Sequence, residues 1–281
     1  MIQETNVYSV YKTDKLIDFL SNNTMKNEDI KQFFQTFSFT HVINQNLDKG
    51  NSAFVFKNAI KDDNTRSKIT QALNKLHQQN LNKIIIMIRE IQFQTLDELT
   101  ELVNQCIQKI KRDNDQIKPL VAALCWELLS TYFLSSTGDK IYFRKLLLTA
   151  VKNDYIENTN FTNDNWSKDK GEKTMILIGI LFNNKIIDQQ IMIKIILDYK
   201  NRIIYNEKGT QEDYDIVEKS IHQLSCLISS IIMNDDAIII YDDIDVFLEK
   251  QMEIYEEKKC ISKKIRLVCK NCIDELRKRK K

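Results

Sequence analysis

The sequence predicts an all-α protein. Proline occurs once and glycine five times in 281 residues, so few positions interrupt a helix. Apolar residues recur three and four positions apart along most of the chain, which is the period of an amphipathic helix. The helical stretches also follow one another at nearly constant spacing. We therefore expect a HEAT-repeat-like right-handed solenoid of about five antiparallel helix pairs, preceded by a largely extended N-terminal segment.

The stretch Ile141–Val151 lies at the centre of this array. It follows a turn signal, Gly138-Asp139, and carries apolar residues on both faces of a helix. A helix that is apolar on two faces is buried on two sides, as in a stack of helix pairs. We expect this helix to begin at Asp139 and to end near Asn153.

Start signals define the other helices. Thr95 and Glu98 fit a capping box, Pro119 fits a first helical turn, and Asp188 and Ser262 fit N-caps. The ten expected helices span 67–77, 81–93, 95–111, 120–135, 139–153, 173–184, 189–199, 214–233, 244–257 and 262–277.

The spacing of the pairs supports a repeat. Pair starts near Thr95, Asp139, Asp188 and Ile238 lie 44, 49 and 50 residues apart. HEAT repeats are ~40–47 residues long. The array is expected over residues 61–281.

Charge and hydropathy exclude some classes of protein. The net charge is only +2, so the overall electrostatics do not indicate a nucleic-acid binder. The charge bias is local, at Arg277, Lys278 and Arg279 in the basic C-terminal tail, which can contact RNA phosphates or simply be a solvated end. The longest apolar run, 175–182, is far shorter than the ~18 residues of a membrane span. We expect no membrane partner.

The six cysteines fall within apolar helical stretches, and no secretory signal precedes them. We interpret them as reduced, buried thiols of a cytoplasmic protein. Cys269 and Cys272 have metal-ligand spacing, but a zinc site needs four ligands. Cys260 and His222 are the only further donors nearby, so core cysteines are the preferred interpretation.

No motif for catalysis is recognisable. The cluster Asp242-Asp243-Ile244-Asp245 could bind a cation, but it fits better as negative charge at a helix N-terminus. The histidines stand apart from any Ser or Cys motif, and the glycines form no phosphate-binding loop. We expect neither an enzyme nor a bound cofactor.

A short peptide motif lies near the N-terminus. Tyr11, Leu16 and Ile17 fit the pattern Tyr-x4-Leu-apolar, with which a helical peptide can dock onto a partner. The same pattern in Tyr142–Leu148 is interpreted as core packing. Only the first copy lies outside the array, where it is free to fold on a partner.

Four segments resemble the middle domain of translation initiation factor 4G, over about 54–277. In order along the chain, the first two match the family's Leu-Asn-Lys-Leu and Phe-Arg-Lys-Leu-Leu-Leu. The last two resemble its Ile-Gly-Glu-Leu-Phe and its Ser-Ser-Arg-Ile-Arg-Phe with the closing Asp-Leu-Arg. Here these segments are Leu73–Leu76, Phe143–Leu148, Ile178–Phe182 and Ser262–Leu267 with Asp274–Arg277.

The resemblance implies two protein partners. Family members bind the DEAD-box RNA helicase, initiation factor 4A, and stimulate its ATP cycle. By resemblance, Phe143, Leu73 and Leu76 contribute to that contact, with Phe54 and Phe56 from an aromatic arm before the array. Core packing is the alternative for Phe143.

The motif of Tyr11, Leu16 and Ile17 resembles the family's docking sequence for the cap-binding protein, initiation factor 4E. Residues 1–22 are thus expected to hold the docking motif, and 23–60 the linker and the aromatic arm. Two alternatives remain. One is a related middle domain in mRNA decay, splicing or poly(A)-binding-protein interaction, and the other is a plain RNA-binding helical solenoid.

Overall fold

The computed structural model describes residues 65–161, 166–231 and 243–279. The chain divides into two units, Met1–Ser52 and Ala53–Lys281, and every described residue belongs to the second. Three predictions lie outside the described residues: the docking motif at Tyr11, the arm with Phe54 and Phe56, and the pair start near Ile238.

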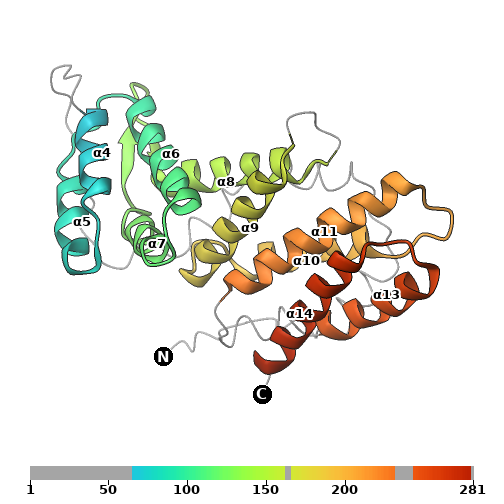
Figure 1. The fold of residues 1–281 in the computed structure, drawn as a ribbon. Helices are drawn as coiled ribbons and strands as arrows, with labels where there is room; N and C mark the ends of the chain where they lie inside the picture. Colours follow the sequence, from blue (N-terminus) through green and yellow to red (C-terminus); the bar gives the residue numbers. More distant parts are fainter. Residues whose placement is uncertain (1–64, 162–165, 232–242, 280–281) are drawn as a thin grey trace, which may run out of the picture. The chain divides into compact units, whose positions relative to one another are not determined.

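The described ranges contain ten α-helices, one 3₁₀ helix and one β-hairpin (Figure 1). The α-helices are α4 (Thr65–Asn74), α5 (Leu81–Arg89), α6 (Leu96–Arg112), α7 (Ile117–Glu127), α8 (Phe143–Thr159), α9 (Lys168–Asn183), α10 (Gln189–Ile203), α11 (Gln211–Ser230), α13 (Ile244–Lys258) and α14 (Lys263–Arg279). The 3₁₀ helix spans Gln78–Asn80, and the strands are β1 (Tyr132–Leu134) and β2 (Lys140–Tyr142). The predicted all-α class is confirmed. No helix among these is long and apolar enough to cross a membrane.

The helices pack as successive pairs. Within the pairs, α4 packs on α5, α6 on α7, α8 on α9, α10 on α11 and α13 on α14. Between pairs, α4, α6 and α8 pack in sequence, and so do α5, α7, α9, α11 and α14. Two rows of helices therefore share a continuous apolar core, as the HEAT-like prediction requires.

The predicted caps are present. The Thr95 hydroxyl accepts the Glu98 N–H at 3.3 Å, and Glu98 accepts the Thr95 N–H in return. Asp188 Oδ1 accepts the Ile191 N–H at 2.8 Å at the start of α10. Ser262 accepts the Ile265 N–H at 3.4 Å at the start of α14. Pro119 lies in the first turn of α7.

The largest difference from prediction lies between α7 and α8. The helix expected over 120–135 ends at Glu127, and an antiparallel hairpin pairs Tyr132 with Tyr142. Gly138 has φ +86° in the turn, a conformation that glycine adopts without the cost other residues incur. The central helix consequently begins at Phe143, not at Asp139.

Smaller differences concern helix ends and local signals. The central helix continues to Thr159, beyond the predicted Asn153. α9 begins at Lys168, before the predicted Lys173, because Ser167 caps it. The predicted loop 200–213 shortens to 204–210, because Thr210 caps α11.

A buried polar network connects successive pairs. Lys111 Nζ of α6 lies 2.8 Å and 2.9 Å from the two carboxylate oxygens of Asp154 on α8. The Thr174 hydroxyl of α9 donates to the same carboxylate at 2.7 Å. The Tyr155 hydroxyl of α8 donates to Asp198 of α10 at 2.8 Å. Since buried polar groups must find partners, these bonds fix how α6, α8, α9 and α10 pack together.

Candidate interaction surface

Three of the five residues predicted to contact a helicase lie in the core, and the other two, Phe54 and Phe56, lie outside the described residues. Phe143 is fully buried, and Leu73 and Leu76 are also buried. As placed, these side chains offer no surface to a partner. The burial of Phe143 agrees with the alternative interpretation, in which this side chain packs in the core. In the Tyr142–Leu148 pattern, Leu147 and Leu148 are buried, so this copy of the motif packs in the core as predicted.

The neighbours of Phe143 on α8 do reach the surface. Lys145 is exposed, since two residues along a helix place its side chain on the opposite side from Phe143. Arg144 is half-buried, and its Nε is buried without a hydrogen-bond partner in the described ranges. The apolar residue of this segment is Phe143, whereas the residues that reach the surface are Arg144 and Lys145.

The hairpin adds cationic and aromatic groups beside this segment. The Phe143 N–H donates to the Thr131 carbonyl at 2.8 Å, which attaches the start of α8 to the hairpin. The Tyr132 and Tyr142 rings lie 5.6 Å apart, and Lys140 Nζ lies 4.8 Å from the centre of the Tyr132 ring. We call Lys140, Tyr142, Arg144 and Lys145 the α8 entry surface. It suits an acidic partner surface.

A second exposed patch lies on α5 and α7. Ile86 is 55% exposed and Trp126 is 46% exposed. Arg89 of α5 donates to the Glu127 carbonyl of α7 at 2.6 Å, which joins the two helices nearby. Exposed tryptophan is a frequent anchor of protein interfaces. The signal that could have found Trp126 is its position off the apolar stripe of α7.

The basic C-terminal residues are largely engaged within the protein. Arg277 forms ion pairs with Glu249 at 2.6 Å and with Asp245 at 3.5 Å. Arg279 donates to the carbonyls of Ile228 and Ile231 and pairs with Glu275. Lys278 is exposed. This arrangement gives the RNA-binding alternative no particular support.

The described part of the acidic cluster, Asp243 and Asp245, lies at a helix start, in agreement with the preferred interpretation. Asp243 precedes α13 with φ +62° and pairs with Lys200 at 2.7 Å. Asp245 lies in the first turn and is buried. In the part of the chain that the structure describes, no three His, Cys, Asp or Glu side chains are placed to bind a metal ion.

Cys269 and Cys272 are core cysteines, as predicted. Both are buried, and burial raises the pKa of each thiol to about 12. The prediction that all six thiols are buried is wrong for Cys226 and Cys260, which are partly exposed. Cys260 follows the end of α13, and Cys226 lies on the edge of the apolar stripe of α11. Packing is incomplete at both places.

Cys226 stands beside two polar groups. Its Sγ lies 3.8 Å from His222 Nδ1, and His222 Nε2 lies 3.4 Å from Glu172 Oε1. Burial, together with the Glu172 charge, raises the pKa of the Cys226 thiol to about 11. Because the reactive form of cysteine is the thiolate, this arrangement lacks the activated nucleophile that catalysis near neutral pH needs.

Fold and surface together define a class: an α-helical repeat protein with charged and aromatic patches that suit contacts with other macromolecules. No protein-family model and no curated protein matches the sequence. Among solved structures, the chain is similar to the MIF4G domain of translation initiation factor EIF4G5 from Trypanosoma cruzi. The identity is 12%, the TM-score is 0.44, and the match covers 76% of this chain and 96% of that one. Such a similarity is too low to support an inference about function.

Proposed function

We propose that the protein is a non-enzymatic, cytoplasmic scaffold of translation initiation that joins a cap-binding protein to a DEAD-box RNA helicase. The observation that carries the proposal is the position of the four family-like segments. They fall at the end of α4, the start of α8, within α9 and along α14, in family order. Each therefore lies within a helix of the repeat array or overlaps one end of it.

The helicase contact is assigned to the surface of the array. The α8 entry surface presents the exposed Lys140 and Lys145 together with the half-buried Tyr142 and Arg144. Such a surface can hold an acidic patch of a helicase lobe by charge complementarity. A scaffold that contacts both lobes of the helicase in only one relative orientation increases the population of that orientation. Its binding energy is then coupled to ATP and RNA binding by the helicase.

The cap-binding contact is assigned to Tyr11, Leu16 and Ile17. The motif lies upstream of the array, and its spacing suits a short helix that docks an apolar edge. Related middle domains in decay or splicing generally lack this motif, so a contact through Tyr11 separates the proposal from them.

The helicase contact is tested by measuring the RNA-dependent ATPase rate of a purified DEAD-box initiation helicase with and without the full chain. We expect stimulation that falls by about tenfold or more in Lys145→Glu, since one reversed charge opposes the partner's acidic patch. Lys208→Glu, in the exposed connection between α10 and α11, serves as the matched control and keeps the stimulation. Absence of stimulation by the unmodified chain contradicts the helicase role.

A further inference from the structure

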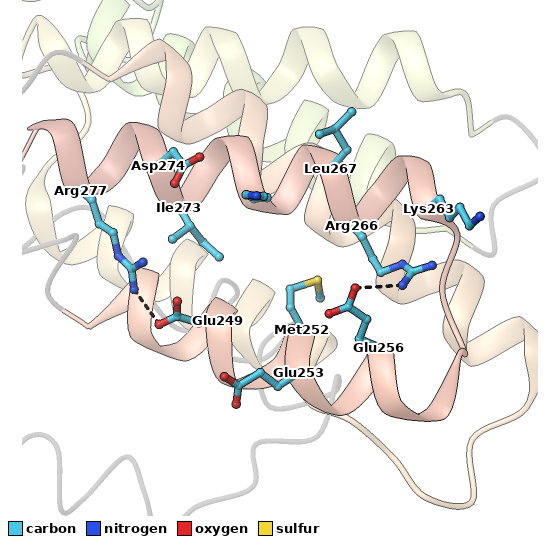
Figure 2. A pocket seen from close by; sticks show the side chains of 11 residues that line it. Glu249, Met252, Glu253, Glu256, Lys263, Arg266, Leu267, Ile273, Asp274 and Arg277 are labelled. Atoms are coloured by element: carbon cyan, nitrogen blue, oxygen red, sulfur yellow. Dashed lines mark hydrogen bonds and ion pairs between the residues drawn. The ribbon is translucent and has the colours of Figure 1, made fainter.

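The last described helix pair carries two facing rows of opposite charge. On α13 the row is Glu249, Glu253 and Glu256, spaced four and three residues apart so that all three lie on one helix face. On α14 the row consists of Lys263, Arg266, Lys270 and Arg277, with one carboxylate, Asp274, between the last two. The two rows border one groove of about 600 Å³ (Figure 2).

The floor of this groove is apolar. Met252 of α13 and Ile273 of α14 line it between the charged rows, and Leu267 lines it from the edge of α14 that faces away from α13 (Figure 2). Leu267 is 60% exposed, so a large aliphatic side chain is exposed to water at the α14 edge of the groove. We call these residues and the two rows the α13–α14 groove.

Ion pairs close the two ends of the groove but leave its middle open. Arg266 pairs with Glu256 at 3.1 Å at one end, and Arg277 pairs with Glu249 at 2.6 Å at the other (Figure 2). Between them, Glu253 and Lys270 form no ion pair with each other within the described ranges. Glu253 points away from α14 in Figure 2.

Arg266 adds an unsatisfied donor at one end. Its Nε is buried and has no hydrogen-bond partner in the described part of the chain. A buried donor without an acceptor is costly.

We propose that the α13–α14 groove binds an amphipathic helix of a partner protein. Apolar residues of that helix, spaced i, i+3 or i+4, and i+7, lie over Met252, Leu267 and Ile273. Its basic flank faces the acidic row of α13, and its acidic flank faces the basic row of α14.

The two-sign border selects this occupant. A nucleic acid carries one sign of charge and would meet the α13 carboxylates at close range, where like charges repel. A helix with both signs matches both rows, and it continues the packing of helix on helix that builds the array. This inference does not rest on the proposed function, because neither the helicase nor the cap-binding contact uses the groove.

The test uses three synthetic helical peptides that share one leucine stripe and differ only in their flanks. The first has lysines on one flank and glutamates on the other, the second has lysines on both, and the third has glutamates on both. Binding to the full chain is followed by fluorescence anisotropy of labelled peptide. We expect the mixed-charge peptide to bind at least about tenfold more tightly than either single-sign peptide.

Variants with matched controls locate the contact. Leu267→Glu is expected to lower the affinity for the mixed-charge peptide by at least about tenfold. Val246→Glu is expected to leave this affinity unchanged. Val246 is also 60% exposed, on α13, but lies outside the groove. Lys270→Glu is expected to make the protein bind the peptide with lysines on both flanks most tightly. Lys250→Glu, on α13 outside the groove, is expected to leave the order of the three affinities unchanged. Far-UV circular dichroism checks that each variant is folded.

Three results would overturn the proposal. One is equal binding of all three peptides, or no binding. Another is an equal loss in Leu267→Glu and Val246→Glu. The third is a dimer of the chain alone that Leu267→Glu converts to monomer in sedimentation velocity, because the groove would then hold a second copy.

Discussion

The first turn of α8 holds residues with opposite environments. Phe143 is enclosed in the core, while Lys145 is exposed two positions later. Any experiment that uses Phe143 as a contact residue therefore tests the stability of the core at the same time. Lys145 separates the two effects, because it can be changed without removing apolar packing.

We predict that Phe143→Ala lowers the free energy of unfolding by about 3–5 kcal/mol, through lost burial and the cavity left behind. Lys145→Ala should change it by less than about 0.5 kcal/mol, as exposed positions do. Urea titration followed by circular dichroism measures both. Equal stability of Phe143→Ala and the unmodified chain would show that this side chain is not buried.

The thiols of Cys269 and Cys272 make stability depend on alkaline pH. Burial raises their folded pKa to about 12, whereas an unfolded thiol ionises near about pH 8.5. The contribution of the two thiols to the free energy of unfolding is therefore complete below about pH 8.5, and it decreases as the pH rises toward the folded pKa.

We predict that going from pH 7.5 to pH 10 costs about 1–2 kcal/mol per buried thiol. The double variant Cys269→Ala/Cys272→Ala should lose less stability over this interval than the unmodified chain. Urea titrations under reducing conditions at both values give the comparison. Parallel losses in the two proteins contradict burial of these thiols.

At the scale of single elements, three start signals in the sequence are confirmed, whereas Asp139 does not start the central helix. The Thr95–Glu98 box, Asp188 and Ser262 each cap the helix expected of them. The hairpin at 132–142 could not be predicted in the same way. Its strands have three residues each, too few for an alternating pattern to stand out from the apolar stretches around them.

The capping box that starts α11 offers a test at this scale. Asp213 accepts the Thr210 backbone N–H at 2.7 Å and the Thr210 hydroxyl at 2.9 Å. These bonds lower the pKa of the Asp213 carboxyl, the backbone bond first. The carboxylate thus stabilises the fold above its unfolded pKa of about 3.9, and this stabilisation is lost as the pH falls through the lower, folded pKa.

We predict that Asp213→Asn is less stable than the unmodified chain at pH 7 and that the difference shrinks below about pH 4. Thr210→Ala, which removes the other half of the box, should cost about 0.5–2 kcal/mol at pH 7. Urea titrations across pH 3–7 measure both effects (the range spans the carboxyl titration). A difference for Asp213→Asn that is independent of pH contradicts the role of the carboxylate.

At the scale of the whole described array, polar hydrogen bonds connect neighbouring helix pairs. They fix the position of one pair against the next, which non-directional apolar packing alone does not. Lys111, Asp154 and Thr174 come from three helices of two neighbouring pairs. Periodicity in the sequence predicts that helices pair, but it carries no information on which polar residues meet across pairs. For the same reason the exposed side of α8 and the α13–α14 groove appeared only in the structure.

We predict that Asp154→Leu costs about 1–3 kcal/mol, because it leaves the largely buried Lys111 ammonium without its carboxylate. The double variant Lys111→Met/Asp154→Leu should cost clearly less than the single variant, since it leaves no unpaired charge. Thermal and urea unfolding provide the double-mutant cycle. Additive costs of the separate changes would contradict the coupling.

The central claim is that one chain holds two partners at once. Sedimentation velocity of the full chain mixed with a purified cap-binding initiation factor and a purified DEAD-box initiation helicase measures this directly. The account predicts one complex that contains all three proteins. Tyr11→Ala should release only the cap-binding factor, and Lys145→Glu only the helicase. Two partners that sediment separately from the unmodified chain would contradict the scaffold.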